Sequence, residues 1–293
     1  MKIRIGLGLS PLDPADDFAT MVERVEEAGI DSLWFSEQTQ SAQVEPVIGL
    51  AYAAARTTRL KVGTSVIVLP GRHPALVAKQ IASLVRLAPR RILPVFGLQP
   101  ARPADRDLFP VPGTRGAVFD EALLLLRLLL EQPSVTFSGE FFAVEEMSVG
   151  PPPTRPPDLW LGGSAAGALR RAGRLADGWL GSLLTPEESS AAVSTITAAA
   201  AEAGRTIEDD HYGMSLRVVL DDAADGVFAA THARRPDVDP RQLVALGWAG
   251  ARELVSRYVG AGLSKFVVQP TSHPGSWDLF VADFAAELSG LEN

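Results

Sequence analysis

Apolar runs of strand length alternate with stretches of helical periodicity along almost the whole chain, at a nearly constant spacing. The first four runs begin near residues 3, 31, 60 and 91, so the intervals between them are 28, 29 and 31 residues. The runs are rich in Val, Ile and Leu, which is typical of parallel strands buried on both faces. Four more runs continue the alternation further along. The spacing therefore predicts an α/β fold, a (β/α)8 TIM barrel in which each of eight strands is followed by a helix.

The expected elements can be given by residue range. Strands are expected at Ile3–Leu9, Ser32–Phe35, Leu60–Leu69, Arg91–Phe96, Leu159–Gly162, Gly178–Gly181, Tyr212–Leu220 and Lys265–Val268. Helices are expected at Pro14–Ala28, Pro46–Thr57, His73–Leu87, Gly116–Glu131, Ala165–Ala176, Pro186–Ala203, Ala251–Gly260 and Trp277–Leu288.

The regular spacing breaks after the fourth strand, because the fourth and fifth strands begin 68 residues apart, near residues 91 and 159. Residues 98–157 are therefore an insertion region, which carries one helix and a hairpin-like pair, Val135–Phe137 and Phe141–Val144. The segment between the seventh and eighth strands is also enlarged and includes a predicted surface loop, Arg234–Pro240. The chain shows no linker and no residue-level repeat, so residues 1–293 are interpreted as one domain.

Composition excludes several classes of protein. The net charge of −8 argues against nucleic-acid binding, for which a basic patch is expected. Cysteine is absent, which excludes disulfides and thiolate chemistry, and the four histidines are scattered, so no metal site is predicted. The longest leucine run, residues 122–130, is too short to span a membrane, and no signal peptide is recognisable. We expect a cytoplasmic protein without membrane contact.

A barrel of this type carries its chemistry at the carboxyl ends of the strands. Glu37 is the one acid that stands out there, and glycosidase chemistry, which needs a pair of acids, is disfavoured. His73 precedes Pro74 at the start of a helix, where it could cap the helix or face the site; the structural role is favoured.

The segment Gly162-Gly163-Ser164 lies where the fifth strand passes into a helix. Free N–H groups and the helix dipole make such a place suitable for an anion, and glycine allows close approach of a phosphate. The same residues, followed by Ala165 and Ala166, depart from the GxSxG nucleophile elbow only in the last residue. A serine hydrolase that uses Ser164 is therefore an alternative, although a regular barrel is the wrong architecture for it.

Several segments resemble the luciferase-like, flavin- and deazaflavin-dependent oxidoreductases, in the same order as the barrel units. They are DSLWFSEQ, KVGTSVIVLPGRHPALVAKQIASLVRL, PPDLWLGGSAAGALRRAGRLADGW and GLSKFVVQP. The chain is most similar to the branch that depends on coenzyme F420, a deazaflavin. The resemblance implies an oxidoreductase that transfers a hydride between a small organic substrate and F420 at the carboxyl rim of the barrel.

The resemblance also implies where the cofactor lies. Its ring would cover a bulge in the third strand, next to Thr64, with a non-proline cis peptide at Ser65–Val66, and Gly97 would lie nearby. Its phosphate would be held at Gly162, Gly163 and Ser164, with Ser182 close by. Members of the family are commonly homodimers, and the apolar outer helices allow this.

The sequence departs from the deazaflavin pattern in two places. Many of these enzymes have Asp-His after the second strand, where this chain has Glu37-Gln38, so Glu37 is the candidate catalytic acid or base. The end of the fourth strand lacks the usual glycine-rich pattern: Pro94 cannot donate to the sheet, and Leu98 and Gln99 stand where glycines would make room beside the ring. An FMN-dependent monooxygenase or reductase and a non-catalytic flavin-binding barrel remain alternatives.

Overall fold

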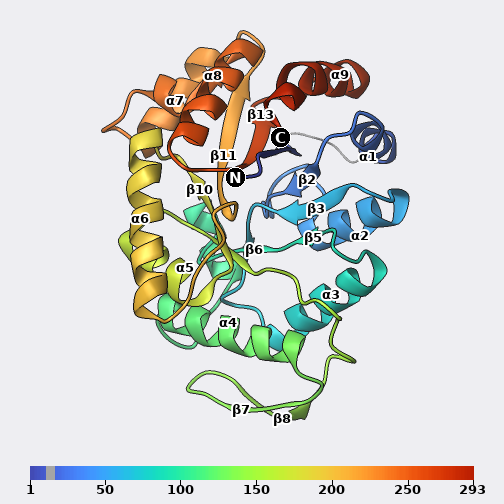
Figure 1. Cartoon of the computed structure of the whole chain (residues 1–293), viewed down its shortest axis with the longest axis vertical. Helices are drawn as coiled ribbons and strands as arrows, with labels where there is room; N and C mark the ends of the chain where they lie inside the picture. The colour runs from blue at the N-terminus through green and yellow to red at the C-terminus, as the bar shows by residue number, and fades with distance from the viewer. Residues whose placement is uncertain (11–16) are drawn as a thin grey trace.

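A computed structural model describes residues 1–10 and 17–293, in which a ring of parallel strands is surrounded by helices (Figure 1). The strands are β1 (Arg4–Gly8), β2 (Ser32–Phe35), β3 (Lys61–Thr64), β4 (Ile67–Val68), β5 (Ile92–Leu93), β6 (Val95–Gly97), β9 (Trp160–Gly162), β10 (Gly178–Ser182), β11 (Tyr212–Val219) and β13 (Lys265–Pro270). Each pairs in parallel with its neighbours, and β13 returns to pair with β1. The predicted barrel is confirmed.

The third and fourth strands of the barrel are each interrupted. The sequence predicts one strand over residues 60–69, but the structure has β3 and β4 on either side of Ser65–Val66; Pro94 separates β5 from β6 in the same way. The ring still closes, because β3 pairs with β5 and β4 pairs with β6. The Thr64 hydroxyl accepts from the Val95 N–H at 2.8 Å and donates to the Val95 carbonyl at 2.9 Å. This side chain bridges the two strands at the point where Pro94 has no N–H to donate.

The helices form the outer layer. They are α1 (Phe18–Glu27), α2 (Pro46–Arg56), α3 (Pro74–Leu87), α4 (Arg115–Glu131), α5 (Ala166–Leu175), α6 (Pro186–Glu202), α7 (Ala224–Arg234), α8 (Gly247–Gly260) and α9 (Trp277–Leu288). Local signals fix several of their starts: Thr185 and Glu188 form a capping box on α6, and His73 accepts from the Ala75 N–H at the start of α3. The structural role favoured for His73 is confirmed. The predicted start of the first helix at Pro14 lies outside the described residues.

The lower part of the barrel interior is filled by side chains. Trp34, Val95, Leu180 and Val267 form a buried cluster there, with Val66, Leu93 and Trp160 packed against it. A Cβ on Gly63 would lie 2.6 Å from the Trp34 ring, so glycine is required beside this indole. The interior is thus a packed core, and a ligand can reach only the ends of the strands.

The insertion after β6 contains the helix η1 (Pro103–Leu108), α4 and an antiparallel hairpin, β7 (Val135–Ser138) with β8 (Ala143–Met147), which confirms the predicted pair. The segment between β11 and β13 is more structured than predicted: α7, η2 (Pro240–Gln242) and β12 (Val244–Leu246) lie there, and β12 pairs with β11. Of the predicted loop 234–240, only residues 235–239 lie outside the helices, where they form the turn between α7 and η2.

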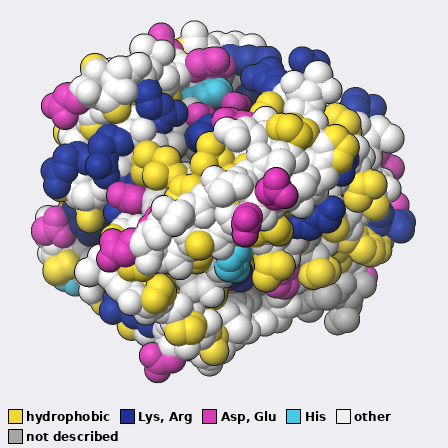
Figure 2. Space-filling view, turned by 90° about the horizontal axis from the view of Figure 1, so that it is seen from below, with side chains coloured by type: hydrophobic (Ala, Val, Ile, Leu, Met, Phe, Trp, Pro, Cys, Tyr) yellow, Lys and Arg dark blue, Asp and Glu magenta, His cyan; other side chains and the backbone are white. Residues whose placement is uncertain are grey.

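The surface on the side of α4 and the hairpin carries basic and acidic side chains interspersed with apolar ones (Figure 2). Among the described residues, none of the helices combines the length and the apolar character needed to cross a bilayer.

Candidate functional site

The bulge in the third barrel strand is the central feature of the carboxyl rim. The Ser65–Val66 peptide bond is cis, as the resemblance implied, and both side chains are partly exposed. The neighbouring strand β2 holds the bulge in place: the Ser65 N–H donates to the Phe35 carbonyl at 2.8 Å, and the Glu37 N–H donates to the Val66 carbonyl at 3.0 Å. The Ser36 hydroxyl donates to the Ser65 carbonyl at 3.0 Å. The bulge is therefore a fixed part of the rim.

Two glycines flank the Val66 side chain. A Cβ on Gly97 would lie 2.5 Å from Val66 Cγ2, and a Cβ on Gly162 would lie 2.8 Å from Val66 Cγ1. Neither contact is possible between real carbon atoms, so both positions require glycine to make room for Val66. The sequence suggested that Gly162 leaves space for a phosphate. The structure shows that Val66 lies beside Gly162 and links β4, β6 and β9 at the floor of the rim, and phosphate binding at Gly162 stays a prediction.

The start of α5 has the properties of an anion site. Gly163 has φ of +107°, a conformation that favours glycine, and its carbonyl accepts from Trp179 Nε1 at 2.8 Å. Residues 163–167 are all exposed, and the N-cap residue Ala165 provides no side-chain cap. The Ala168 N–H donates to the Ala165 carbonyl, so the N–H groups of Ala166 and Gly167 remain available to an anion. Ser182 ends the adjacent strand β10 and is exposed too.

Thr64 and Glu37 occupy different surroundings from those the sequence suggested. Thr64 is fully buried, and its hydroxyl is used in the bonds to Val95. The Glu37 carboxylate binds both terminal nitrogens of Arg72 and accepts from the Val68 N–H at 2.7 Å. Its side chain is only 7% exposed. Glu37 therefore ties β4 and the segment before α3 to the end of β2, and no proton-transfer partner is evident beside it in the described part of the chain.

The hydrolase alternative finds no support at Ser164. No hydrogen bond joins its hydroxyl to a histidine among residues 1–10 and 17–293. The backbone of Ser164 is not in a strained conformation, because Gly163 takes the positive φ of this turn. A nucleophile elbow places the serine itself at the strained position.

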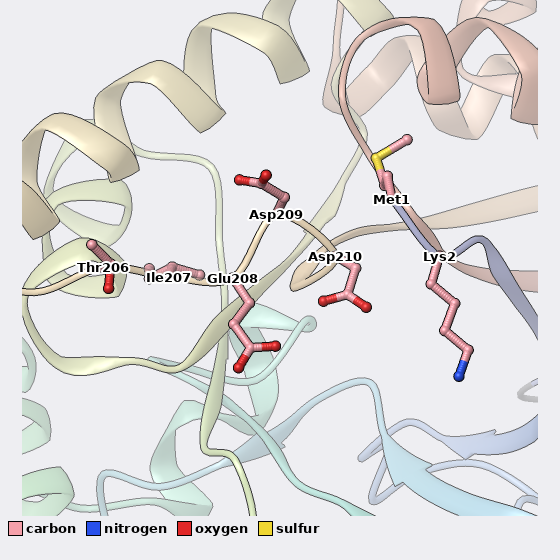
Figure 3. A pocket seen from close by; sticks show the side chains of 7 residues that line it. All are labelled: Met1, Lys2, Thr206, Ile207, Glu208, Asp209 and Asp210. Carbon is pink, nitrogen blue, oxygen red and sulfur yellow. The ribbon is translucent and has the colours of Figure 1, made fainter.

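The structure also brings together a group of residues at the opposite, amino-terminal face of the barrel. A pocket of about 520 Å³ is lined there by Met1, Lys2 and residues 206–210 (Figure 3). The side chains of Glu208 and Asp210 lie close to the His211 ring, whose Nδ1 is 2.7 Å from the Asp177 carbonyl oxygen. This face lies away from the bulge and the α5 start.

The strand β11 was expected, but none of its residues was predicted to belong to the rim. Ser215 and Arg217 on β11 are partly exposed, whereas their neighbours Met214, Leu216 and Val218 are buried. A signal was available: polar residues at every second position of a strand that is otherwise apolar indicate a face without a packing partner.

Several known proteins are similar to this chain in sequence. An uncharacterized protein of Mycobacterium tuberculosis is 37% identical over 174 residues, which is 59% of this chain and 60% of that protein. The F420-dependent glucose-6-phosphate dehydrogenase of Kineococcus radiotolerans is 32% identical over 173 residues, 56% of this chain and 50% of that enzyme. The chain spans between 48% and 62% of the length of the curated relatives it matches.

Solved structures share the fold over the full length. An F420-dependent secondary alcohol dehydrogenase, solved with an F420–acetone adduct, superposes with a TM-score of 0.84 at 19% identity and covers 100% of both chains. The sequence model of one family, described as luciferase-like monooxygenase, matches residues 2–255. This match covers most of the chain, which therefore belongs to the luciferase-like monooxygenase family.

Proposed function

We propose that this protein is an oxidoreductase that binds coenzyme F420 across the carboxyl rim of the barrel and transfers a hydride between it and a small organic substrate. The observation that carries the proposal is the junction of three features: the bulge at Ser65–Val66, the two glycines around Val66, and the uncapped start of α5. The relatives named F420-dependent dehydrogenases support the choice of cofactor.

The residues present fit such a cofactor. Val66 is held between Gly97 and Gly162, so it offers a fixed apolar surface on which a flat ring can rest. The exposed N–H groups at the start of α5, together with the hydroxyls of Ser164 and Ser182, suit a phosphate at one end. Thr64 supports the floor through the sheet and is not included among the groups that contact the cofactor.

A bound deazaflavin would supply the chemistry by giving or accepting the hydride. The protein's residues bind and orient it. The packed interior around Trp34 and Leu180 closes the barrel from below and excludes water on that side. Glu37 and Arg72 hold the bulge through the Val68 N–H. Each of these groups acts by keeping the binding surface in one geometry.

The proposal is tested by titrating the purified protein with F420 and, separately, with FMN, and following the cofactor fluorescence. We expect saturable binding of F420. Ser164→Asp should weaken it about tenfold or more, which corresponds to about 1.4 kcal/mol, because a carboxylate would repel the phosphate at the helix start. Ser190→Asp, at an exposed position of α6, is the matched control and should leave the affinity unchanged. Binding of FMN alone, or of neither cofactor, would refute the proposal.

Replacing Glu37 with Gln distinguishes two roles for this residue. Because its carboxylate is bound to Arg72 and the Val68 N–H, we expect Glu37→Gln to reduce the free energy of unfolding by about 1.5–3 kcal/mol and to weaken F420 binding. The double variant Glu37→Gln/Arg72→Gln should recover part of the stability. Proton transfer by Glu37 stays a prediction; it requires the opposite pattern, in which turnover falls while stability and cofactor affinity are unchanged.

The homodimer and the cytoplasmic location expected from the sequence also stay predictions. Light scattering of the purified protein tests the first, and fractionation of cells that express it tests the second.

A further inference from the structure

Arg217 faces the mouth of the barrel. In parallel strands, residues in register point to the same side of the sheet, and sides alternate along each strand. Ser215 is in register with Val267 and Arg217 with Gln269. Val267 belongs to the interior cluster around Trp34. Arg217 therefore lies on the inner face of β11, one layer above that cluster, and it remains partly exposed.

The charge of Arg217 is not balanced by an acid. No carboxylate of the described residues lies within 4.0 Å of its guanidinium, although the chain forms many ion pairs elsewhere. Its hydrogen-bond partner is neutral: one terminal nitrogen donates to the Thr231 hydroxyl on α7 at 3.1 Å. Burial lowers the pKa of the Arg217 guanidinium, and the charge of Arg234 lowers it further. A cation that is largely buried and has no counter-ion is costly, so a functional reason for it is needed.

Other polar groups with unsatisfied hydrogen-bonding capacity lie in the same sector. Thr271 directly follows β13, and its N–H donates to the Val218 carbonyl at 3.1 Å, which places it beside Arg217 across the strand pair. The Thr271 hydroxyl is buried and lacks a hydrogen-bond partner in the described structure. Near the end of β1, Gln43 and Gln269 both donate to the Leu9 carbonyl, and the buried Oε1 of Gln43 is unpaired as well. Such orphaned groups in a native structure call for a missing partner.

We infer that Arg217 binds an anionic group, a carboxylate or a phosphate, carried by the substrate. This inference rests on the proposed function, because it assigns one part of the rim to the cofactor and the neighbouring part to the substrate. The cofactor features lie on β4, β6, β9 and β10, whereas Arg217, Thr271 and Gln43 lie beside β11, β13 and β1. The two groups of strands are consecutive around the ring. A substrate that enters over β11 and β13 would meet the guanidinium with its acidic end.

The first test observes Arg217 directly. The protein is labelled with [¹⁵N]arginine, and the Nε–H signal of Arg217 is identified as the one absent from the spectrum of Arg217→Lys. Inorganic phosphate and acetate are then titrated, with sodium chloride at equal ionic strength as the baseline. We expect a saturable shift of the Arg217 signal with phosphate or acetate. Arg257, exposed on α8, is the control and should follow the baseline. An Arg217 signal that moves no more than in sodium chloride would overturn the inference.

Stability and cofactor affinity provide the second test. Because the charge is unpaired in the folded chain, Arg217→Met should leave the midpoint of thermal unfolding unchanged or raise it; a clear fall would show a structural role instead. The affinity for F420 should stay within about twofold of wild type. A tenfold loss in Arg217→Met, with Arg217→Lys unaffected, would assign the anion to the cofactor and refute the substrate assignment. If wild-type protein binds no F420, the proposed function fails, while the phosphate titration still decides whether Arg217 is an anion site.

Discussion

Replacing Gly97 with alanine is expected to displace Val66 and to disrupt the rim of the barrel. The added Cβ would lie 2.5 Å from Val66 Cγ2, and valine is too stiff about χ1 to move this methyl away without cost. Overpacking of this kind costs roughly 1–3 kcal/mol of unfolding free energy. Because Val66 forms the surface on which the proposed cofactor rests, binding of F420 should fall by more than the loss of stability alone would cause.

The clash can be tested by relieving it. Val66→Ala removes both methyl groups that approach Gly97 and Gly162, so the double variant Gly97→Ala/Val66→Ala should be more stable than the sum of the single effects predicts. Chemical unfolding of the four proteins in this cycle measures the coupling. Gly260→Ala is the matched control, because nothing lies within 4 Å of a Cβ at that exposed position on α8; it should be neutral or slightly stabilising, since alanine favours the helix more than glycine does. Additive effects at Gly97 and Val66 would show that the contact is unimportant.

Replacing Asp31 with asparagine is expected to have the largest effect on stability. The Asp31 carboxylate forms ion pairs with three cations at the amino-terminal end of the barrel. It binds Lys265, and it lies 2.7 Å from Lys61 Nζ and 3.6 Å from Arg4 Nε. The Asp31 side chain is 7% exposed and Lys265 is buried. Removing one member of a buried pair leaves the other charge unpaired, which costs roughly 3–5 kcal/mol.

Urea unfolding of Asp31→Asn tests this expectation. Glu23→Gln is the control, because its ion pair with Arg56 joins two exposed side chains and should be worth less than about 1 kcal/mol. Adding Lys265→Met to Asp31→Asn should restore part of the loss, since the buried charge is removed as well. A loss at Asp31 no larger than that at Glu23 would contradict the prediction.

The Asp31 carboxylate also makes the free energy of unfolding depend on pH in the acidic range. Burial by itself raises the pKa of Asp31, but the charges of Lys265 and Lys61 outweigh this and bring it from 3.8 down to about 2. Because the pKa of Asp31 is lower in the folded protein than in the unfolded chain, the ionised carboxylate stabilises the fold. This stabilisation of about 2 kcal/mol is fully present above pH 3.8 and is lost as the pH falls through about 2. The stability difference between wild type and Asp31→Asn should therefore narrow in this range; a constant difference would exclude the mechanism.

The barrel itself could be predicted because its signals are local. Each strand is a short apolar run, and caps such as Thr185 with Glu188 mark helix starts within a few residues. These sequence signals did not predict the elements that bury few side chains. In α7 only Thr231 is buried, so its sequence has no apolar stripe, and β12 is only three residues long. Both were missed.

The site was predicted only in part. The cis peptide at Ser65–Val66 was expected from the family resemblance, and Pro94 was recognised as a residue that cannot donate to the sheet. Phosphate binding at the Gly-Gly-Ser segment stays a prediction. Gly162 has a further role that the sequence did not suggest, because Val66, nearly a hundred residues away in the chain, fills the space beside it. Glu37 looked like a free acid, but Arg72, 35 residues further on, binds it.

The sequence alone therefore determined the order of the eight barrel strands and of the helices with an apolar face, because periodicity and turn chemistry act over neighbouring residues. Only the tertiary structure decided which polar groups on the rim are paired. The ring of strands brings Glu37 onto Arg72 and leaves Arg217 without an acid among the described residues. Pairing depends on contacts between distant segments, and the free energy of a buried charge depends on that pairing.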